Sequence, residues 1–138
     1  MISSSNYGLD AKRFDSSSND WKNSEIRQWL NGDFYNNAFN EKEKKNINPF
    51  NGDNVFLLSK EEAKKYFAND ESRRCKATEY AVKNGAWKSD EGYGYWWLRS
   101  MFLAQYLCVY CVDLNGSVFH DKALNDKMIV RPALWINL

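Results

Sequence analysis

The sequence predicts an α+β domain, because its pattern changes once along the chain and no linker divides it. Between residues 24 and 84, apolar side chains recur at helical spacing behind capping residues. After Gly94 the chain becomes aromatic and β-prone, with a hairpin-turn signal between apolar runs. Helices first and antiparallel strands last are typical of this class. We expect one domain over residues 1–138, mainly helical over 1–93 and built of strands over 94–138.

Composition excludes several classes of protein. The 19 basic and 18 acidic residues give a net charge of +1, without the basic excess of a nucleic-acid-binding protein. No apolar stretch approaches the roughly 18 residues that span a membrane. Residues 1–5 lack the charged and apolar regions of a signal peptide. We therefore expect no nucleic-acid partner and no membrane insertion. Where the protein acts stays open, and display on a virion or cell surface within a larger protein is one option.

The helical part begins after an irregular, Ser/Asn/Asp-rich lead-in over residues 3–20. Ser24 is predicted to cap the first helix, and Gly32 to end or kink it. Capping boxes open two further helices, at Asn40 with Glu43 and at Ser59 with Glu62. The last helix is expected over 78–84, with Gly85 at its C-terminal cap.

The strands are predicted mostly after Gly94. Asn115 and Gly116 form a strong hairpin-turn signal. Pro132 indicates that part of the last strand lies at a sheet edge. The expected strands, with one short apolar run before Gly94, cover residues 55–58, 95–99, 107–113, 117–120 and 129–136.

Several segments resemble a family of uncharacterised bacterial and phage domains, which are distant relatives of the C-type lectin and formylglycine-generating-enzyme folds. Individually these segments are modestly specific, but their order and spacing extend over nearly the whole chain. They are EIRQWLN at 25–31, VFLLS at 55–59, CKATEYA at 75–81, WWLRS at 96–100, NGSV at 115–118 and VRPALW at 130–135. The resemblance implies a C-type-lectin-like fold with its small antiparallel sheet at the C-terminal end.

Some members of that family are variable proteins of diversity-generating retroelements, in which reverse transcription rewrites adenine-containing codons near the 3′ end of the gene. After Ser100, where family members have Pro-Gly, this chain has Met101-Phe102-Leu103. Most of the residues that depart from the pattern can arise from a randomised Asn codon. Another template codon, or no diversification, is needed for Met101, Lys122, Lys127 and Met128. The resemblance implies that the diversified, ligand-binding positions are Met101, Phe102, Leu103, Tyr106, Tyr110, Asp113, Leu114, Phe119, His120, Asp121, Lys122, Leu124, Asp126 and Lys127.

The residues alone point the same way, because apolar side chains occupy predicted turns, where polar residues are usual. Exposed apolar groups gathered in one region mark an interaction site; the alternative is that several fill a core beneath the loops. We expect Tyr106, Phe119, His120, Asp121 and Leu124 to be exposed. Scaffold roles are expected for Trp96, Trp97, Leu98, Val130, Ala133, Leu134 and Trp135. The predicted function is binding of a protein or glycan ligand on a cell surface, and the alternative is an undiversified structural or cell-surface domain.

We expect no enzyme, cofactor or essential metal. Cys108 and Cys111 form a C-x-x-C, but residues three apart on a strand point to opposite faces, so they should neither bridge nor share a metal. The single histidine, His120, and the absence of a second C-x-x-C argue against structural zinc. A copper-dependent oxidase like the formylglycine-generating enzyme is a less favoured alternative, since no residues around the two cysteines match such a site.

The C-terminal strand poses a separate question. Family members begin with strands ahead of the segment that aligns with residues 1–3, so the resemblance implies that the strand at 129–136 lacks its usual partner. An unpaired edge is adhesive. We expect it to be covered by residues near Met1 and Ile2, by another protomer, or by a segment of a longer parent.

Overall fold

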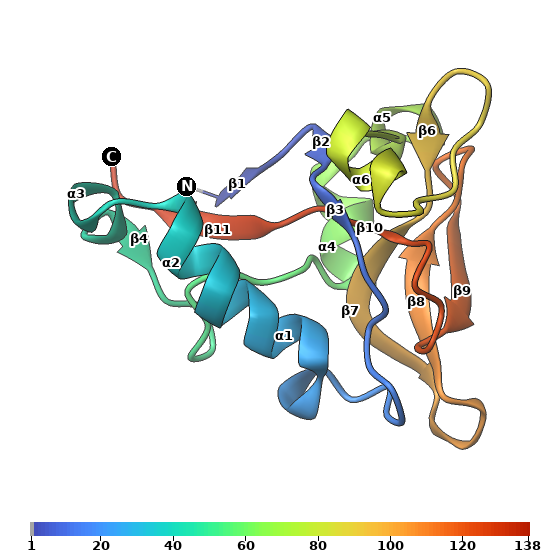
Figure 1. Cartoon of the computed structure of the whole chain (residues 1–138), viewed down its shortest axis with the longest axis horizontal. Helices are drawn as coiled ribbons and strands as arrows, with labels where there is room; N and C mark the ends of the chain where they lie inside the picture. Colours follow the sequence, from blue (N-terminus) through green and yellow to red (C-terminus); the bar gives the residue numbers. More distant parts are fainter. Residues whose placement is uncertain (1) are drawn as a thin grey trace.

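A computed structural model describes residues 2–138, apart from the side chains of residues 2–4 and 104, and it has an α+β architecture (Figure 1). The helices, including 3-10 and π segments, are η1 (Trp21–Asn23), α1 (Glu25–Trp29), η2 (Leu30–Phe34), α2 (Tyr35–Ala38), α3 (Glu41–Lys44), α4 (Lys60–Tyr66), α5 (Asp70–Arg73), α6 (Glu79–Lys83) and η3 (Ala104–Tyr106). The strands are β1 (Ile2–Ser4), β2 (Tyr7–Gly8), β3 (Asp10–Ala11), β4 (Ile47–Asn48), β5 (Cys75–Ala77), β6 (Tyr93–Gly94), β7 (Trp96–Leu103), β8 (Cys108–Val112), β9 (Val118–Lys122), β10 (Ile129–Val130) and β11 (Ala133–Ile136). The prediction of mixed helix and sheet is confirmed.

A five-stranded sheet, in the order β3-β10-β7-β8-β9, is the centre of the molecule. Alternation along β7 sends Trp97 into one core cluster and its neighbours Trp96 and Leu98 into the other. All three side chains are fully buried. A sheet covered on both faces needs apolar residues at consecutive positions, which explains the run of aromatic and aliphatic residues in this strand.

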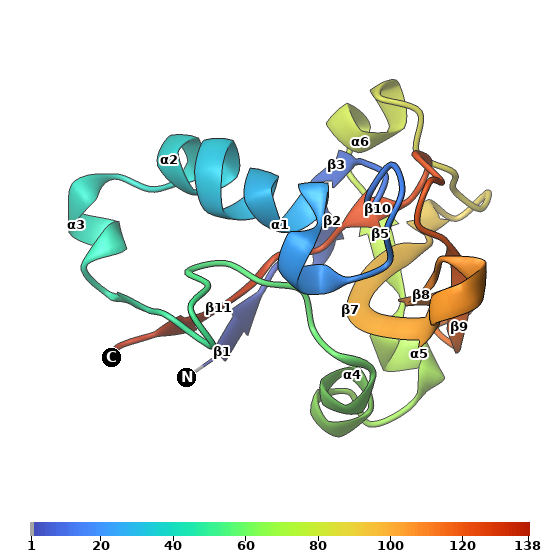
Figure 2. The ribbon, with the colours of Figure 1, turned by 90° about the horizontal axis from the view of Figure 1, so that it is seen from below.

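Three predicted helix starts are confirmed. The Ser24 side chain accepts a hydrogen bond from the Arg27 N–H, and Asn40 and Ser59 open α3 and α4 with complete capping boxes. Gly32 neither ends nor sharply breaks the first helix, contrary to expectation. Instead, η2 continues it as a π-helical turn into α2, so α1, η2 and α2 form one rod (Figure 2).

The lead-in at residues 3–20 is not irregular throughout, which corrects the expectation for that segment. Three short strands lie within it or at its start: β1 pairs with β11, β2 with β5, and β3 with β10. Each has only two or three residues, so no alternation of polar and apolar residues reveals it. The two ends of the chain thus share sheets, and β1 and β11 run side by side in both views (Figures 1 and 2).

The predicted strand at 55–58 is buried but is not a regular strand. Its four apolar side chains lie in the two cores, and Phe56 makes a single bridge to Ala133, with N–O distances of 2.9 and 2.8 Å. An adjacent carbonyl, Leu58 O, accepts from the Arg99 N–H at 2.9 Å. This segment bonds to β11 and to β7, which belong to two different sheets, without becoming a strand of either sheet.

The predicted strand at 129–136 is divided. β10 belongs to the five-stranded sheet and β11 to a three-stranded sheet in the order β1-β11-β4. Pro132, expected at an edge, is buried at the break between them, where its missing N–H removes one ladder bond. β11 is paired on both sides, by β1 and by β4. Three ways of covering the C-terminal strand were expected, and the one observed is pairing with the chain's own N-terminal segment.

The scaffold residues of the C-terminal half are buried to different degrees. Trp96, Trp97, Leu98, Val130 and Ala133 are buried, whereas Leu134 and Trp135 are half-buried. Within residues 2–138, no helix combines the length and the apolar character needed to cross a bilayer.

Candidate functional site

The predicted ligand-binding residues lie mainly on β7, β8 and β9 and on the connections at one end of these strands. β7 and β8 are antiparallel, with register shifts after Trp97 and after Met101, and η3 connects them. β9 is the edge strand of the sheet and pairs with β8 throughout. Figure 1 shows the three strands side by side, with the η3 connection at their lower end.

Three of the predicted residues form an aromatic cluster on one face of these strands. The rings of Phe102 and His120 are stacked, with centroids 3.8 Å apart and planes 5° apart. Tyr110 meets Phe102 edge-on at 5.1 Å, and the Lys60 ammonium lies 4.5 Å from the Tyr110 ring centroid. All three rings are half-buried. The cluster therefore supports the strands as well as contributing surface.

Beside the cluster, the η3 end of the sheet encloses a cavity of about 230 Å³. Its apolar wall is formed by Tyr106, Leu107 and Leu124, whose side chains are 60%, 44% and 59% exposed. Residues 16–18 of the N-terminal loop form the facing wall, together with Lys122 near the end of β9. An apolar cavity rimmed by exposed side chains is a shape that accepts an anchoring side chain of a partner.

Buried polar side chains fix the facing loop. The Asn19 amide donates to the carbonyls of Leu103 and Cys108, both at 3.0 Å, and the side chain is 3% exposed. Asp15, 6% exposed, accepts from the Ser17, Ser18 and Glu25 N–H groups at 2.9–3.0 Å. The cavity is therefore preformed by a braced loop.

Leu107 carries backbone strain at the cavity. Its φ is +52°, in the left-handed region that costs an L-residue with a Cβ roughly 1–2 kcal/mol. Its carbonyl accepts from the Ala123 N–H at 2.9 Å, which holds the turn against the end of β9. Strained non-glycine residues concentrate at functional sites, where the surrounding structure maintains them.

Two of the predicted residues lie away from this end. Asp113 and Leu114 are in the β8–β9 turn at the opposite end of the hairpin, where the Asp113 carboxylate accepts from the N–H groups of Asn115 and Ser117. Asp126 and Lys127 follow β9, and the Lys127 carbonyl accepts from the Trp87 N–H. The Asp113 side chain therefore stabilises its own turn, and proximity to the η3 end does not support the assignment of Asp113 and Leu114 to the binding surface.

Other predicted residues lie on β9 and on the outer part of β7. Phe119 is 50% exposed, whereas His120 and Asp121 are only half-exposed, and none of the three is buried. The Asp121 carboxylate accepts from the Lys122 N–H and from the Asn125 amide. Met101 and Leu103, on the outer part of β7, are 44% and 41% exposed.

Sequence reasoning missed Leu107, Asn19 and the loop at 16–18. Leu107 was predicted as the first residue of the strand at 107–113, whereas it lies in the turn before β8 with a positive φ. Nothing local marks the others, because Asn19 acts through carbonyls 84 and 89 residues away.

The two cysteines of the C-x-x-C occupy different environments. Cys111 lies in the core with Trp97, while Cys108 is half-buried, with its sulfur 3.5 Å from the Tyr106 carbonyl oxygen. Burial raises the pKa of the Cys111 thiol far above its ordinary value, and raises that of Cys75 to about 11. Within the described residues, no three His, Cys, Asp or Glu side chains gather to hold a metal ion.

We expect a thiol reagent at pH 8 to modify Cys108 in the folded protein and the other two only on unfolding. A Cys108→Ser variant should then show no rapid reaction, and two rapidly reacting thiols in the native wild type would contradict the assignment.

Because folding raises the pKa values of the buried Cys75 and Cys111 thiols, these two groups contribute fully to the stability of the fold below about pH 8.5. This contribution declines as pH rises further, so the free energy of unfolding should fall.

Comparisons with known proteins place the chain in a family without assigning it an activity. A family model described as a domain of unknown function, DUF6273, matches residues 2–54 and 50–138, so the chain belongs to that family. Neither a curated protein nor a solved structure matches the chain.

Proposed function

We propose that this domain binds a protein or glycan ligand through an apolar surface at the η3 end of its central sheet and along β9. The observation that carries the proposal is a concentration of exposed apolar side chains. Of the eleven large hydrophobic side chains recorded as exposed in the described part of the chain, six lie between residues 101 and 124. We call these six the apolar surface: Met101, Leu103, Tyr106, Leu107, Phe119 and Leu124.

Exposing this many apolar side chains to water costs free energy unless a partner covers them. Single exposed apolar residues are ordinary, but apolar residues gathered in one region mark an interaction site. Three of the six, Tyr106, Leu107 and Leu124, line the cavity. The surface is supported by a packed scaffold, since β7 is buried on both faces at 96–98, β8 is buried on both faces at 111–112, and Asn19 braces the facing loop. Loops held on a rigid scaffold are the usual location of binding residues.

The separation of scaffold from surface also supports a diversified binding protein of a retroelement. The framework segment at 96–98 is fully buried, whereas the fourteen positions assigned to ligand binding are half-buried or exposed. Cys111 and Ala123 also depart from the family pattern, but they are buried and belong to the core. Substitutions at exposed positions usually change stability by about 0.5 kcal/mol or less. A domain arranged in this way tolerates a changing surface without losing its fold.

The alternative is an undiversified structural or cell-surface domain of the same fold. The gene neighbourhood discriminates between them: a near-copy of the 3′ segment beside a reverse-transcriptase gene supports diversification, and its absence supports the alternative. We retain the prediction that the domain is not an enzyme.

The apolar surface is best tested with two libraries displayed on the same scaffold. The first randomises Tyr106, Leu107 and Leu124, and the matched control randomises three exposed aromatic residues elsewhere, Tyr7, Tyr66 and Trp87. We expect most members of the first library to fold, and selection against several purified proteins and glycans to yield binders mainly from it.

Two results would contradict the proposal. Loss of folding in most members of the first library would show that its residues are structural. Equal recovery of binders from both libraries would show that the η3 end has no special capacity for recognition.

A further inference from the structure

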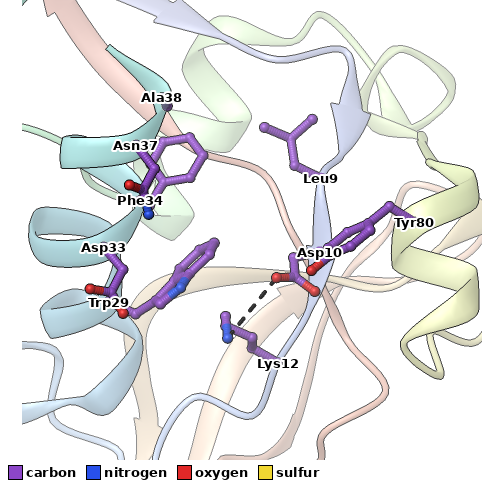
Figure 3. Close-up of a pocket in the computed structure, with 9 residues that line it drawn as sticks. All are labelled: Leu9, Asp10, Lys12, Trp29, Asp33, Phe34, Asn37, Ala38 and Tyr80. Carbon is purple, nitrogen blue, oxygen red and sulfur yellow. Dashed lines mark ion pairs between the residues drawn. The ribbon is translucent and has the colours of Figure 1, made fainter. Parts of the chain in front are cut away.

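A second cleft, sharing no residue with the apolar surface, lies between the helical rod and the β3 region (Figure 3). Its volume is about 480 Å³, within the range of small-molecule sites. Trp29 and Phe34 extend from the rod on one side, and Tyr80 of α6 lies on the other, beside Asp10 (Figure 3). The Trp29 and Phe34 ring centroids are 5.3 Å apart, so the two rings form a continuous aromatic wall.

The wall includes the π-helical turn. Asp33 and Phe34, both in η2, line the cleft. A π turn adds a residue to the helical repeat and changes which side chains face a neighbour, and such turns are frequent at functional sites. The turn brings a carboxylate and a ring to the same cleft.

The Asp10 carboxylate on the facing side is oriented by its own hydrogen bonds. Its Oδ1 accepts from the Ala11 N–H at 2.8 Å and from the Asn84 amide at 2.9 Å. Its Oδ2 is 4.0 Å from the Lys12 ammonium, beyond hydrogen-bonding distance. Since Asp10 is only 9% exposed, this is a nearly buried carboxylate held in place, and its contact with the Lys12 ammonium is long.

Lys12 shows what the cleft accepts. Its Nζ lies 4.5 Å from the Trp29 ring centroid while keeping its long contact with Asp10. An ammonium ion is therefore held there by the ring and by charge, without a short N–H···O bond to Asp10. A cation without any N–H group would lose no hydrogen bond at such a position. Cation–π contacts also favour quaternary ammonium groups.

We propose that this cleft binds an organic cation with a quaternary ammonium head group, and that Lys12 occupies the position in the free protein. The incoming cation replaces Lys12 over Trp29 and gains contacts with Phe34 and Tyr80. Asp10 and Asp33 balance its charge. Displacement of Lys12 is easy because its side chain is 33% exposed and its ion pair is long.

The test is calorimetric titration of the full chain with choline, with its neutral isostere 3,3-dimethylbutanol, and with ethanolamine. We expect choline to bind at least about tenfold tighter than the neutral isostere, since charge over an aromatic ring is the source of affinity. Ethanolamine, with a more strongly hydrated primary ammonium, is expected to bind more weakly than choline. Equal binding of choline and its isostere would overturn the proposal.

Variants isolate the role of Lys12. Lys12→Met removes the internal cation and keeps the aliphatic stem, so choline affinity should rise about tenfold. Lys42→Met, on the exposed face of α3, is the matched control and should leave affinity unchanged. Asp33→Asn, at an exposed position of the rod, should lower affinity several-fold without unfolding the domain. Unchanged choline affinity in Lys12→Met, with folding confirmed by circular dichroism, would refute the displacement of Lys12.

Discussion

Trp97→Ala is expected to lower the free energy of unfolding by about 3–5 kcal/mol, enough to unfold most of a marginally stable domain. The side chain is fully buried and meets Phe14 edge-on, with ring centroids 5.8 Å apart. Its indole N–H also donates to the Lys12 carbonyl at 2.8 Å, so truncation leaves a cavity and a carbonyl without that partner. Thermal and chemical denaturation measure the loss.

Trp87→Ala is the control for that experiment, because Trp87 is 45% exposed. Its replacement should cost much less than that of Trp97. If Trp97→Ala retained its melting temperature but abolished ligand binding, scaffold and surface would be assigned the wrong way round.

Gly116→Ala is the second change with a large expected effect, about 2–5 kcal/mol of destabilisation. The residue has φ of +86°, which disfavours any Cβ by roughly 1–2 kcal/mol. A Cβ built there would also lie 1.7 Å from the Asp70 carbonyl oxygen of α5, so the hairpin turn or α5 must move. Forcing atoms into packed structure typically costs a further 1–3 kcal/mol or so.

Gly52→Ala separates the two causes. Its φ is +85°, nearly the same, but nothing lies within 4 Å of an added Cβ. We expect it to cost only the backbone strain. Equal destabilisation by the two substitutions would mean that the close approach of the β8–β9 turn to α5 adds nothing to the cost of a Cβ at Gly116.

Interactions between residues close together in the sequence determined the helix starts and the β8–β9 hairpin. A cap such as Ser59 with Glu62 involves residues three apart, and the Asn115-Gly116 turn is equally local, so both can be read without knowing the fold. Consecutive apolar residues at 96–98 likewise indicated a buried strand, and the prediction that Trp96 and Trp97 are scaffold agrees with their burial.

The tertiary structure alone decided what depends on distant partners. β1 to β3 are too short to show periodicity and form against strands far along the chain, and Pro132 divides the last strand between two sheets. The loop braced by Asn19 belongs to the same class, as does the anchoring of the π turn by Asn31, whose side chain bonds to the backbone of Asn54 and Val55. Local sequence specifies a cap or turn because its partners are neighbours. It cannot specify these features, since their hydrogen bonds and contacts come from residues that only folding brings near.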